Sequence, residues 1–356
     1  MEWLWYAIVG IVCLSGAVWT GNRLFQDYLI SRYGKHLVRG FEEKPIFIIP
    51  RGQPLESAEN VYFHSSDGYQ LCGCYLRTPA SRRLGVILFG VPYGASRWTC
   101  VPFCEKLVDA GFDVFAFEFR NQGDSESMPG YEPLHWVTKY DVIDAESAIE
   151  YLRTRPDAEP TGIGFFGVSK GAAAGLLASA SNPYVRCFVT DGVFDTFTVV
   201  VPFMRKWIAI YSQRRWLQRI LPSWFYEQAG RRCLERDYRN RGKDWHYVDL
   251  KPVMGSLSPR PLLMIHGAAD NYIAPQIGQA LFEAAKPPKE FWLVEGAKHN
   301  TSVHVAGDEY HRRVIEFFRE HLASNPAALN GYAQTAGSAN GSPQQTLAVS
   351  RGSSSS

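Results

Sequence analysis

Short apolar runs alternate with helix-like segments through most of the chain. These runs lie at residues 84–89, 163–166, 187–190, 261–267 and 291–294, and the last precedes an amphipathic stretch containing Val314, Ile315, Phe317 and Phe318. Apolar runs of this length, separated by helices, are typical of strands buried in a parallel sheet. The pattern predicts an α/β domain over residues 58–322, with a mostly parallel central sheet and helices on both faces.

The amino terminus has a different pattern. Residues Trp3 to Thr20 carry no charge and are mostly apolar. As a helix they would extend about 27 Å, close to the bilayer's hydrocarbon thickness of about 30 Å. Aromatic residues mark both ends, as in a membrane aromatic belt, and the cations Arg23, Arg32, Lys35 and Arg39 follow. We predict a single-pass membrane anchor with the carboxyl-terminal body of the chain in the cytoplasm; a cleaved signal peptide and a buried helix are the competing interpretations.

Four parts follow from these patterns. Residues 1–22 are expected to be the anchor, 23–57 a juxtamembrane connector, and 58–322 the α/β domain. Residues 323–356 are rich in Ala, Gly, Ser, Asn and Gln, and we expect a disordered tail because such a segment buries too little apolar surface. Residues 196–245 interrupt the alternation of strands and helices within the α/β domain.

Ser169 lies in the pentapeptide Gly167-Val168-Ser169-Lys170-Gly171, between an apolar run and a small-residue run. A G-x-S-x-G sequence between strand and helix is typical of a sharp turn that exposes a nucleophilic serine above a sheet. The flanking glycines allow the helix and strand to approach closely. We therefore predict that Ser169 is a catalytic nucleophile.

A serine nucleophile needs a base and an orienting acid, and two downstream residues fit. Asp270 and His299 each follow the end of a predicted strand, where open α/β sheets place functional groups. The order Ser, Asp, His differs from those of chymotrypsin and subtilisin. Asp195 is a rival acid and His304 a rival base.

The chemistry also needs two backbone N–H groups to bind an oxyanion. One is expected from Lys170, which follows the nucleophile, and the other from the loop after the run 84–89. Pro92 in that loop has no N–H, so Val91 is the predicted donor and Tyr93 the substitute.

Residues 60–321 resemble the α/β-hydrolase superfamily in three further segments. They are the Asp-Gly turn within 63–71, the segment Phe117–Ser125, which contains Arg120 and Gly123, and the helix-like segment 140–152. The chain is most similar to the lysophospholipase and serine-aminopeptidase-like groups and to membrane-anchored α/β-hydrolase domain-containing proteins. The resemblance implies the α/β-hydrolase fold, with residues 58–322 as the catalytic domain and a helical cap at about 196–245. It also implies a serine hydrolase activity that needs no cofactor or metal.

Two residues depart from that pattern. Phe89-Gly90 stands where the family commonly has His-Gly, and Lys170 stands where a small or apolar residue is commoner. The Ser-Lys-Gly version resembles acyl-CoA thioesterases and acyl-CoA:amino acid N-acyltransferases. Lys170 could steer an anionic substrate; we favour the interpretation that its stem packs on the helix and its amine reaches solvent.

Composition agrees with an intracellular enzyme. The net charge of +2 gives no indication of nucleic-acid binding, and seven cysteines without paired spacing suit a reducing compartment. Cys72, Cys74, Cys100 and Cys104 are closely spaced, but no His/Cys cluster completes a zinc site, so we expect core cysteines.

The segment 196–245 is aromatic and basic, with eleven Lys/Arg residues against four acidic ones. This composition suits either an interface with anionic lipid headgroups or an ordinary solvated cap. The combined prediction is a membrane-anchored hydrolase of carboxylic esters, with a lipid ester or lysophospholipid as the favoured substrate and a peptide or small ester next. The alternatives are a thioesterase or acyltransferase on the same fold, and a non-catalytic binding protein. The sequence leaves the oligomeric state open.

Overall fold

A computed structural model describes residues 2–44, 48–211 and 220–323 of the chain. The strands are β1 (Glu59–His64), β2 (Gln70–Leu76), β3 (Gly85–Gly90), β4 (Phe112–Phe117), β5 (Ile163–Val168), β6 (Val185–Asp191), β7 (Leu262–Gly267) and β8 (Lys289–Val294). The α-helices are α1 (Glu2–Phe41), α2 (Cys100–Asp109), α3 (Lys139–Thr154), α4 (Ser169–Ser179), α5 (Thr196–Tyr211), α7 (Ser223–Asn240), α8 (Pro275–Ala284), α9 (Ser302–Ala306) and α10 (Asp308–Phe318). Short helical turns cover Arg97–Thr99, Lys251–Leu257 and Arg319–Ala323.

The strands form one eight-stranded sheet in the order β1-β2-β4-β3-β5-β6-β7-β8. β1 and β2 pair antiparallel, β2 pairs antiparallel with β4, and the remaining pairs are parallel. The predicted α/β-hydrolase fold with a mostly parallel sheet is therefore confirmed. The chain reverses its direction of winding beside β3 and β5, and the carboxyl ends of these strands form the crevice where open α/β sheets bind ligands.

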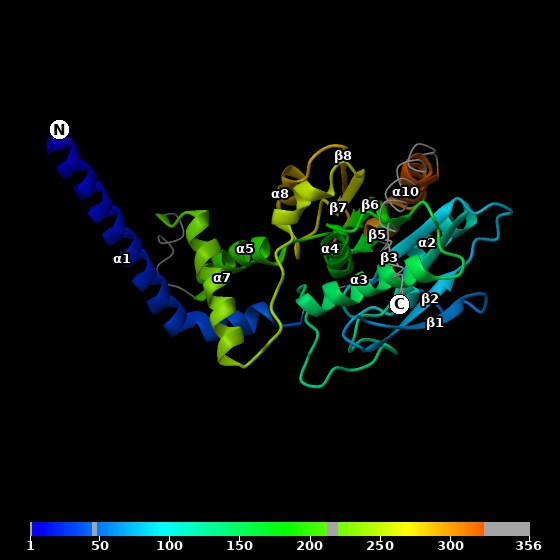
Figure 1. Cartoon of the computed structure of the whole chain (residues 1–356), viewed down its shortest axis with the longest axis horizontal. Coiled ribbons are helices and arrows are strands. Elements are labelled where there is room, and N and C mark those ends of the chain that lie inside the picture. The colour runs from blue at the N-terminus through cyan, green and yellow to red at the C-terminus, as the bar shows by residue number, and fades with distance from the viewer. Residues whose placement is uncertain (1, 45–47, 212–219, 324–356) are drawn as a thin grey trace, which may run out of the picture.

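Neighbouring residues of β5 show how the sheet is covered on both faces. Phe166 packs against Phe103 of α2 and Tyr310 of α10. A Cβ added to Gly175 of α4 would lie 2.0 Å from the ring of Phe165, so that ring points to α4. Because successive strand residues point to opposite faces, α2 and α10 cover one face and α4 the other, as Figure 1 shows.

The cap forms a second apolar core beside the sheet. α5 and α7 pack on each other, and their buried residues join those of the segment 131–140 and of the start of α8. This places two helices of the predicted cap segment 196–245 over the edge where the strands end (Figure 1). Residues 212–219 of that segment, and all of the expected tail except Ala323, lie outside the described residues.

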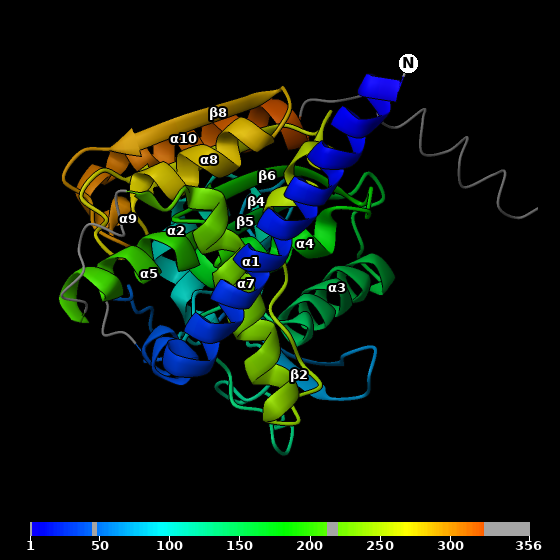
Figure 2. The same ribbon diagram turned by 90° about the vertical axis from the view of Figure 1, so that its left-hand side faces the viewer.

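The amino-terminal helix is longer than the expected anchor. α1 runs without a break to Phe41, so the boundary predicted at residue 22 falls within a helix. Its first turns project beyond the rest of the chain (Figures 1 and 2). Its second half packs on α5 and α7, with Gln26, Gly34, Leu37, Val38 and Phe41 buried. The first 19 residues of the expected connector, 23–41, thus belong to a third helix of the cap.

α1 is also the one helix among the described residues that is long and apolar enough to cross a membrane, by length and composition. None of its most apolar 18-residue window is buried within the molecule. A core helix of a soluble domain would be mostly buried, so this exposure is consistent with a membrane span or a signal sequence.

Candidate active site

The turn between β5 and α4 places Ser169 in a conformation that costs backbone energy. Its φ is +52°, in the left-handed region that residues other than glycine rarely adopt. A Cβ added to Gly171 would lie 2.3 Å from the carbonyl oxygen of Val91, so α4 can begin this close to the loop after β3 only with glycine there. The local sequence thus forces the serine to the carboxyl edge of the sheet.

The structure brings Ser169, His299 and Asp270 together in one hydrogen-bonded chain. Ser169 Oγ lies 2.9 Å from His299 Nε2, and His299 Nδ1 lies 2.6 Å from Asp270 Oδ2. Because an ionised carboxylate only accepts hydrogen bonds, Nδ1 carries the proton and donates to Asp270. Nε2 is then the acceptor for the serine hydroxyl. All three residues are buried, between 3% and 5% exposed.

The second oxygen of Asp270 fixes the carboxylate in place. Asp270 Oδ1 accepts hydrogen bonds from the backbone N–H groups of Tyr272 and Ile273, at 2.9 and 2.8 Å. His266 donates from Nε2 to the Ile273 carbonyl at 2.8 Å, and this hydrogen bond also holds the loop that contains Asp270. The carboxylate is therefore oriented before any substrate arrives.

The rival residues lie elsewhere. Asp195 accepts hydrogen bonds from the backbone of Thr198 and Leu250, which ties the start of α5 to a neighbouring loop. Burial and the neighbouring Asp249 raise the pKa of Asp195 to about 6. His304 is exposed on α9. The geometry brings neither of them into the chain of hydrogen bonds to Ser169.

A further buried carboxylate lies close to the histidine loop and was not identified from the sequence. Asp191 ends β6 and accepts hydrogen bonds from the hydroxyls of Ser302 and Tyr310, at 2.9 and 3.0 Å. Gly192 follows with φ +65°, and a Cβ there would lie 3.2 Å from His299 Cε1. Asp191 thus anchors the two helices that follow the histidine. In the sequence Asp191 directly follows the apolar run 187–190, and this position could have identified it as a candidate site residue.

The two predicted oxyanion donors, the backbone N–H groups of Val91 and Lys170, are close in space. This follows because Gly171, the residue after Lys170, lies against the backbone of Val91.

The side chain of Lys170 differs from both interpretations made from the sequence. It is fully buried, and Nζ pairs with Asp141 Oδ1 at 2.8 Å. The expectation that the amine reaches solvent was wrong, because its partner lies on α3, which packs against α4.

Aromatic rings connect the histidine to the end of α1. The ring of Tyr272 lies 5.3 Å from that of His299 and 6.2 Å from that of Trp136. Trp136 stacks on Phe41 at 4.4 Å, and its Nε1–H donates to the Phe41 carbonyl at 2.7 Å. The amino-terminal helix therefore ends against the wall of the candidate site. The helical spacing of Gly34, Leu37, Val38 and Phe41 was a weak signal of this contact.

The closely spaced cysteines Cys72, Cys74, Cys100 and Cys104 are buried and unpaired. Among the described residues, Cys72, Glu118 and Asp124 could together offer ligands to a metal ion. Arg97 Nη1 already lies 3.0 Å from Glu118 and 2.8 Å from Asp124, so the two carboxylates have a cationic partner.

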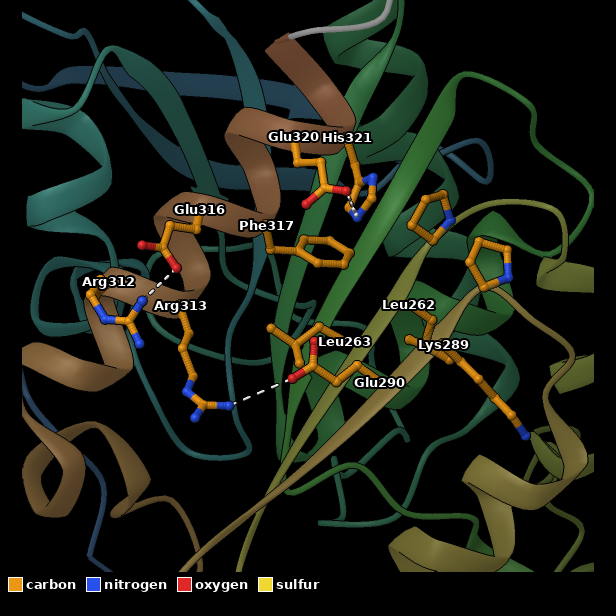
Figure 3. A pocket seen from close by; sticks show the side chains of 12 residues that line it. Leu262, Leu263, Lys289, Glu290, Arg312, Arg313, Glu316, Phe317, Glu320 and His321 are labelled. Carbon is orange, nitrogen blue, oxygen red and sulfur yellow. Dashed lines mark hydrogen bonds and ion pairs between the residues drawn. The ribbon is translucent and has the colours of Figure 1, made fainter.

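A cavity of about 410 Å³ lies away from these residues. It is bounded by Leu262 and Leu263 of β7, Lys289 and Glu290 of β8, and charged residues of α10 (Figure 3). These are the amino ends of the two strands, whereas Asp270 and His299 follow their carboxyl ends. The charges around the cavity pair with one another, Arg312 with Glu316 and Arg313 with Glu290. The cavity is therefore separate from the Ser169 site.

Comparison with known proteins agrees with the fold. The alpha/beta hydrolase family model matches residues 86–315. The chain is 26% identical over 267 residues to the uncharacterized protein YfhR of Escherichia coli (strain K12), covering 73% of this chain and 80% of YfhR. It is 22% identical over 310 residues to the alpha/beta hydrolase domain-containing protein WAV2 of Arabidopsis thaliana, covering 81% and 91%.

Among solved structures, the Pyrococcus furiosus esterase Pf2001 aligns with a TM-score of 0.57 at 20% identity, covering 78% of this chain and 97% of the esterase. Acetyl xylan esterase 1 from Thermoanaerobacterium aligns with a TM-score of 0.53 at 16% identity, covering 82% and 94%. At these identities the likeness is one of fold. The family match covers well over half of the sequence: this chain belongs to the alpha/beta hydrolase family.

Proposed function

We propose that the protein is a membrane-anchored serine hydrolase that cleaves carboxylic esters. The observation that carries this proposal is the hydrogen-bonded chain Asp270–His299–Ser169, with the serine in a strained turn at the carboxyl edge of the sheet. A hydroxyl in this arrangement can transfer its proton to the imidazole as it attacks a carbonyl.

The reaction has two halves. His299 Nε2 takes the proton of Ser169 as Oγ bonds to the carbonyl carbon of the ester. The tetrahedral intermediate then collapses: the bond to the alcohol oxygen breaks, and His299 returns the proton to that oxygen. Water next gives a proton to Nε2 as its oxygen bonds to the acyl carbon. The bond between that carbon and Ser169 Oγ then breaks, His299 returns the proton to Oγ, and the acid is released. Asp270 orients the imidazole and stabilises its charged form.

The backbone N–H groups of Val91 and Lys170 are the proposed donors to the oxyanion. Donors held in place before the reaction stabilise the developing charge without reorganisation, and losing one such donor typically costs about 10²–10³ in kcat. Gly171 allows the two amides to converge, since a side chain there would force the loop after β3 away from α4.

A lipid ester or lysophospholipid is the favoured substrate class. The exposed apolar helix and the aromatic rings beside His299 suit a substrate with an acyl chain, and several proteins of this fold, including Pf2001, are named esterases. The thioesterase or acyltransferase alternative came from the resemblance of the Ser-Lys-Gly sequence. The ion pair with Asp141 buries the amine of Lys170, so this amine is not free to steer an anionic substrate.

The assignment of the acid can be tested by comparing two aspartates of similar burial. Asp270→Asn should slow turnover of p-nitrophenyl butyrate by orders of magnitude, about 10⁴-fold in the analogous trypsin variant. Asp195→Asn is the control and should change turnover far less, because Asp195 serves the start of α5. Comparable or reversed effects would show that the acid lies after β6.

A further inference from the structure

α7 runs alongside α1 in the same direction. Phe225, near the start of α7, lies 5.8 Å from Phe25, measured between ring centroids. Further on, Cys233 Sγ lies 3.6 Å from the carbonyl oxygen of Gly34, and Arg241, just after α7, pairs with Glu42 at 2.9 Å. The first turn of α7 is therefore level with residue 25 of α1, just after the apolar span.

This register gives the first turn of α7 a defined depth relative to a bilayer. Residue 25 follows Thr20 by five helical residues, which is about 7.5 Å. The headgroup layer on each side of the hydrocarbon core is about 5–7.5 Å thick, so a residue about 7.5 Å beyond the core lies at the outer edge of this layer. If α1 spans the membrane as far as Thr20, the start of α7 lies at the level of the headgroups.

The side chains found there are apolar and uncovered. Ile220 is 66% exposed, Trp224 52% and Phe25 40%. The ring of Trp224 lies 6.3 Å from that of Phe225, which itself contacts Phe25, so two helices contribute to one continuous surface. We call Phe25, Ile220 and Trp224 the cap patch. Exposed cations lie on the same helices or nearby, Arg23 on α1 and Lys206 on α5.

We propose that the cap patch binds the headgroup layer of the bilayer as a second membrane contact beside the α1 span. Tryptophan favours this layer because its ring is apolar and its N–H is polar, and nearby cations favour anionic lipids. The cap patch is continuous with the apolar span of α1, which the anchoring proposal places in lipid. We therefore favour a lipid surface, and not a protein partner, as what this patch contacts. Two contacts fix how the cap is oriented on the membrane. The inference rests on the anchoring proposed above.

Spin labels in the full-length chain can test this contact in vesicles of phosphatidylcholine and phosphatidylglycerol. Cys13 is the one exposed cysteine among the described residues, so a Cys13→Ser background leaves only buried thiols. Single labels are then placed by Trp224→Cys, by Trp19→Cys within the span, and by Tyr62→Cys on β1. The positions 19 and 62 are matched references, 64% and 59% exposed.

The measurement is the accessibility of each label to oxygen, which partitions into lipid, relative to a water-soluble nickel complex. The proposal predicts a value for position 224 between those of positions 19 and 62, at headgroup depth. If 19 is lipid-immersed but 224 matches 62, the cap patch does not touch the membrane, although the anchor stands. A label at 224 shielded from both reagents would indicate a protein partner instead. If 19 is also water-exposed, both the contact and the anchoring proposal fail.

Discussion

At the scale of single residues, buried charges surround the candidate site. Asp191 is fully enclosed, and burial raises its pKa from an ordinary 3.8 to about 6, despite the hydrogen bonds from Ser302 and Tyr310. The folded protein thus holds this proton more tightly than the unfolded chain does. The charged carboxylate is tolerated because it ties the helices after His299 to the sheet.

The sign of the pH effect follows from that pKa. Below about pH 4 the carboxyl is protonated in both states, and it adds no penalty. As the pH rises through about 6, the folded protein must accept a buried charge, which costs up to about 3 kcal/mol of unfolding free energy. Asp191→Asn removes this penalty. Its melting temperature relative to the wild type should therefore rise between pH 4 and pH 7.5, measured by circular dichroism. A pH-independent difference would contradict the buried charge.

Lys170 and Asp141 form a buried ion pair, and removing one partner leaves a charge alone in the core. Lys170→Met should lower the free energy of unfolding by about 3–5 kcal/mol. The double variant Lys170→Met/Asp141→Asn should recover part of that loss. Turnover of a neutral ester by the folded fraction should persist, because the proposed oxyanion donor is the backbone N–H of residue 170. Unchanged stability with a selective loss of activity on anionic substrates would mean that Lys170 contacts substrate.

At the scale of elements, α1 serves two purposes along its length. Its first part is exposed and apolar, while its second part completes the cap and ends at Phe41, which stacks on Trp136. Burying a phenylalanine contributes about 1.5–3 kcal/mol, and truncating one in a core typically costs about 3–5 kcal/mol. The cap and the candidate site therefore depend on the second half of this helix.

Two truncations separate these roles. Deleting residues 2–22 should release the protein from the membrane fraction and leave turnover of a soluble ester largely intact. Deleting residues 2–41 should abolish soluble activity, because it removes Leu37, Val38 and Phe41 from the cap core. Turnover and thermal melting of the two proteins are compared side by side. Equal activity and stability would show that the second half of α1 is dispensable.

The central strands, the serine turn and the proximity of Ser169, Asp270 and His299 were predictable because their signals are local. Five apolar runs of the sequence form β3, β5, β6, β7 and β8, and each of the three residues follows one of these runs. The burial of Lys170 was not predictable, because its partner Asp141 lies on another helix and only the packing of α3 on α4 brings them together. The extent of α1 was missed for a similar reason: Gln26 reads as a solvated residue until Arg232 and Gln228 of α7 pair with it.

At the scale of the whole molecule, the charges after the span bear on orientation. Arg23, Arg32, Lys35 and Arg39 are exposed on α1, and loops rich in such cations stay on the cytoplasmic side. In sealed vesicles or intact cells, protease added from the extracytoplasmic side should leave the catalytic domain intact. Digestion of that domain would show that it lies on the extracytoplasmic side, opposite to the prediction. A mature protein without residues 1–22 would show that this segment is a signal peptide.

The length of α1 also bears on the substrate. From Phe25, at the proposed headgroup level, to Phe41 the helix extends about 24 Å. Phe41 begins the row of rings that reaches His299. If the anchoring proposal holds and α1 runs along the membrane normal, a substrate has to leave the bilayer to reach Ser169, which is easier for an ester with one acyl chain than for a two-chain lipid. Within the proposed function, this favours a lysophospholipid or another single-chain ester.

The central claim is that Ser169 is an activated nucleophile, and covalent labelling tests it most directly. A fluorophosphonate reacts with serines that a neighbouring base has activated, and mass spectrometry of the digested protein identifies the modified residue. We predict a single modified residue, Ser169, with the modification lost in Ser169→Ala. Labelling of another serine, or no labelling in a preparation that still turns over esters, would contradict the account.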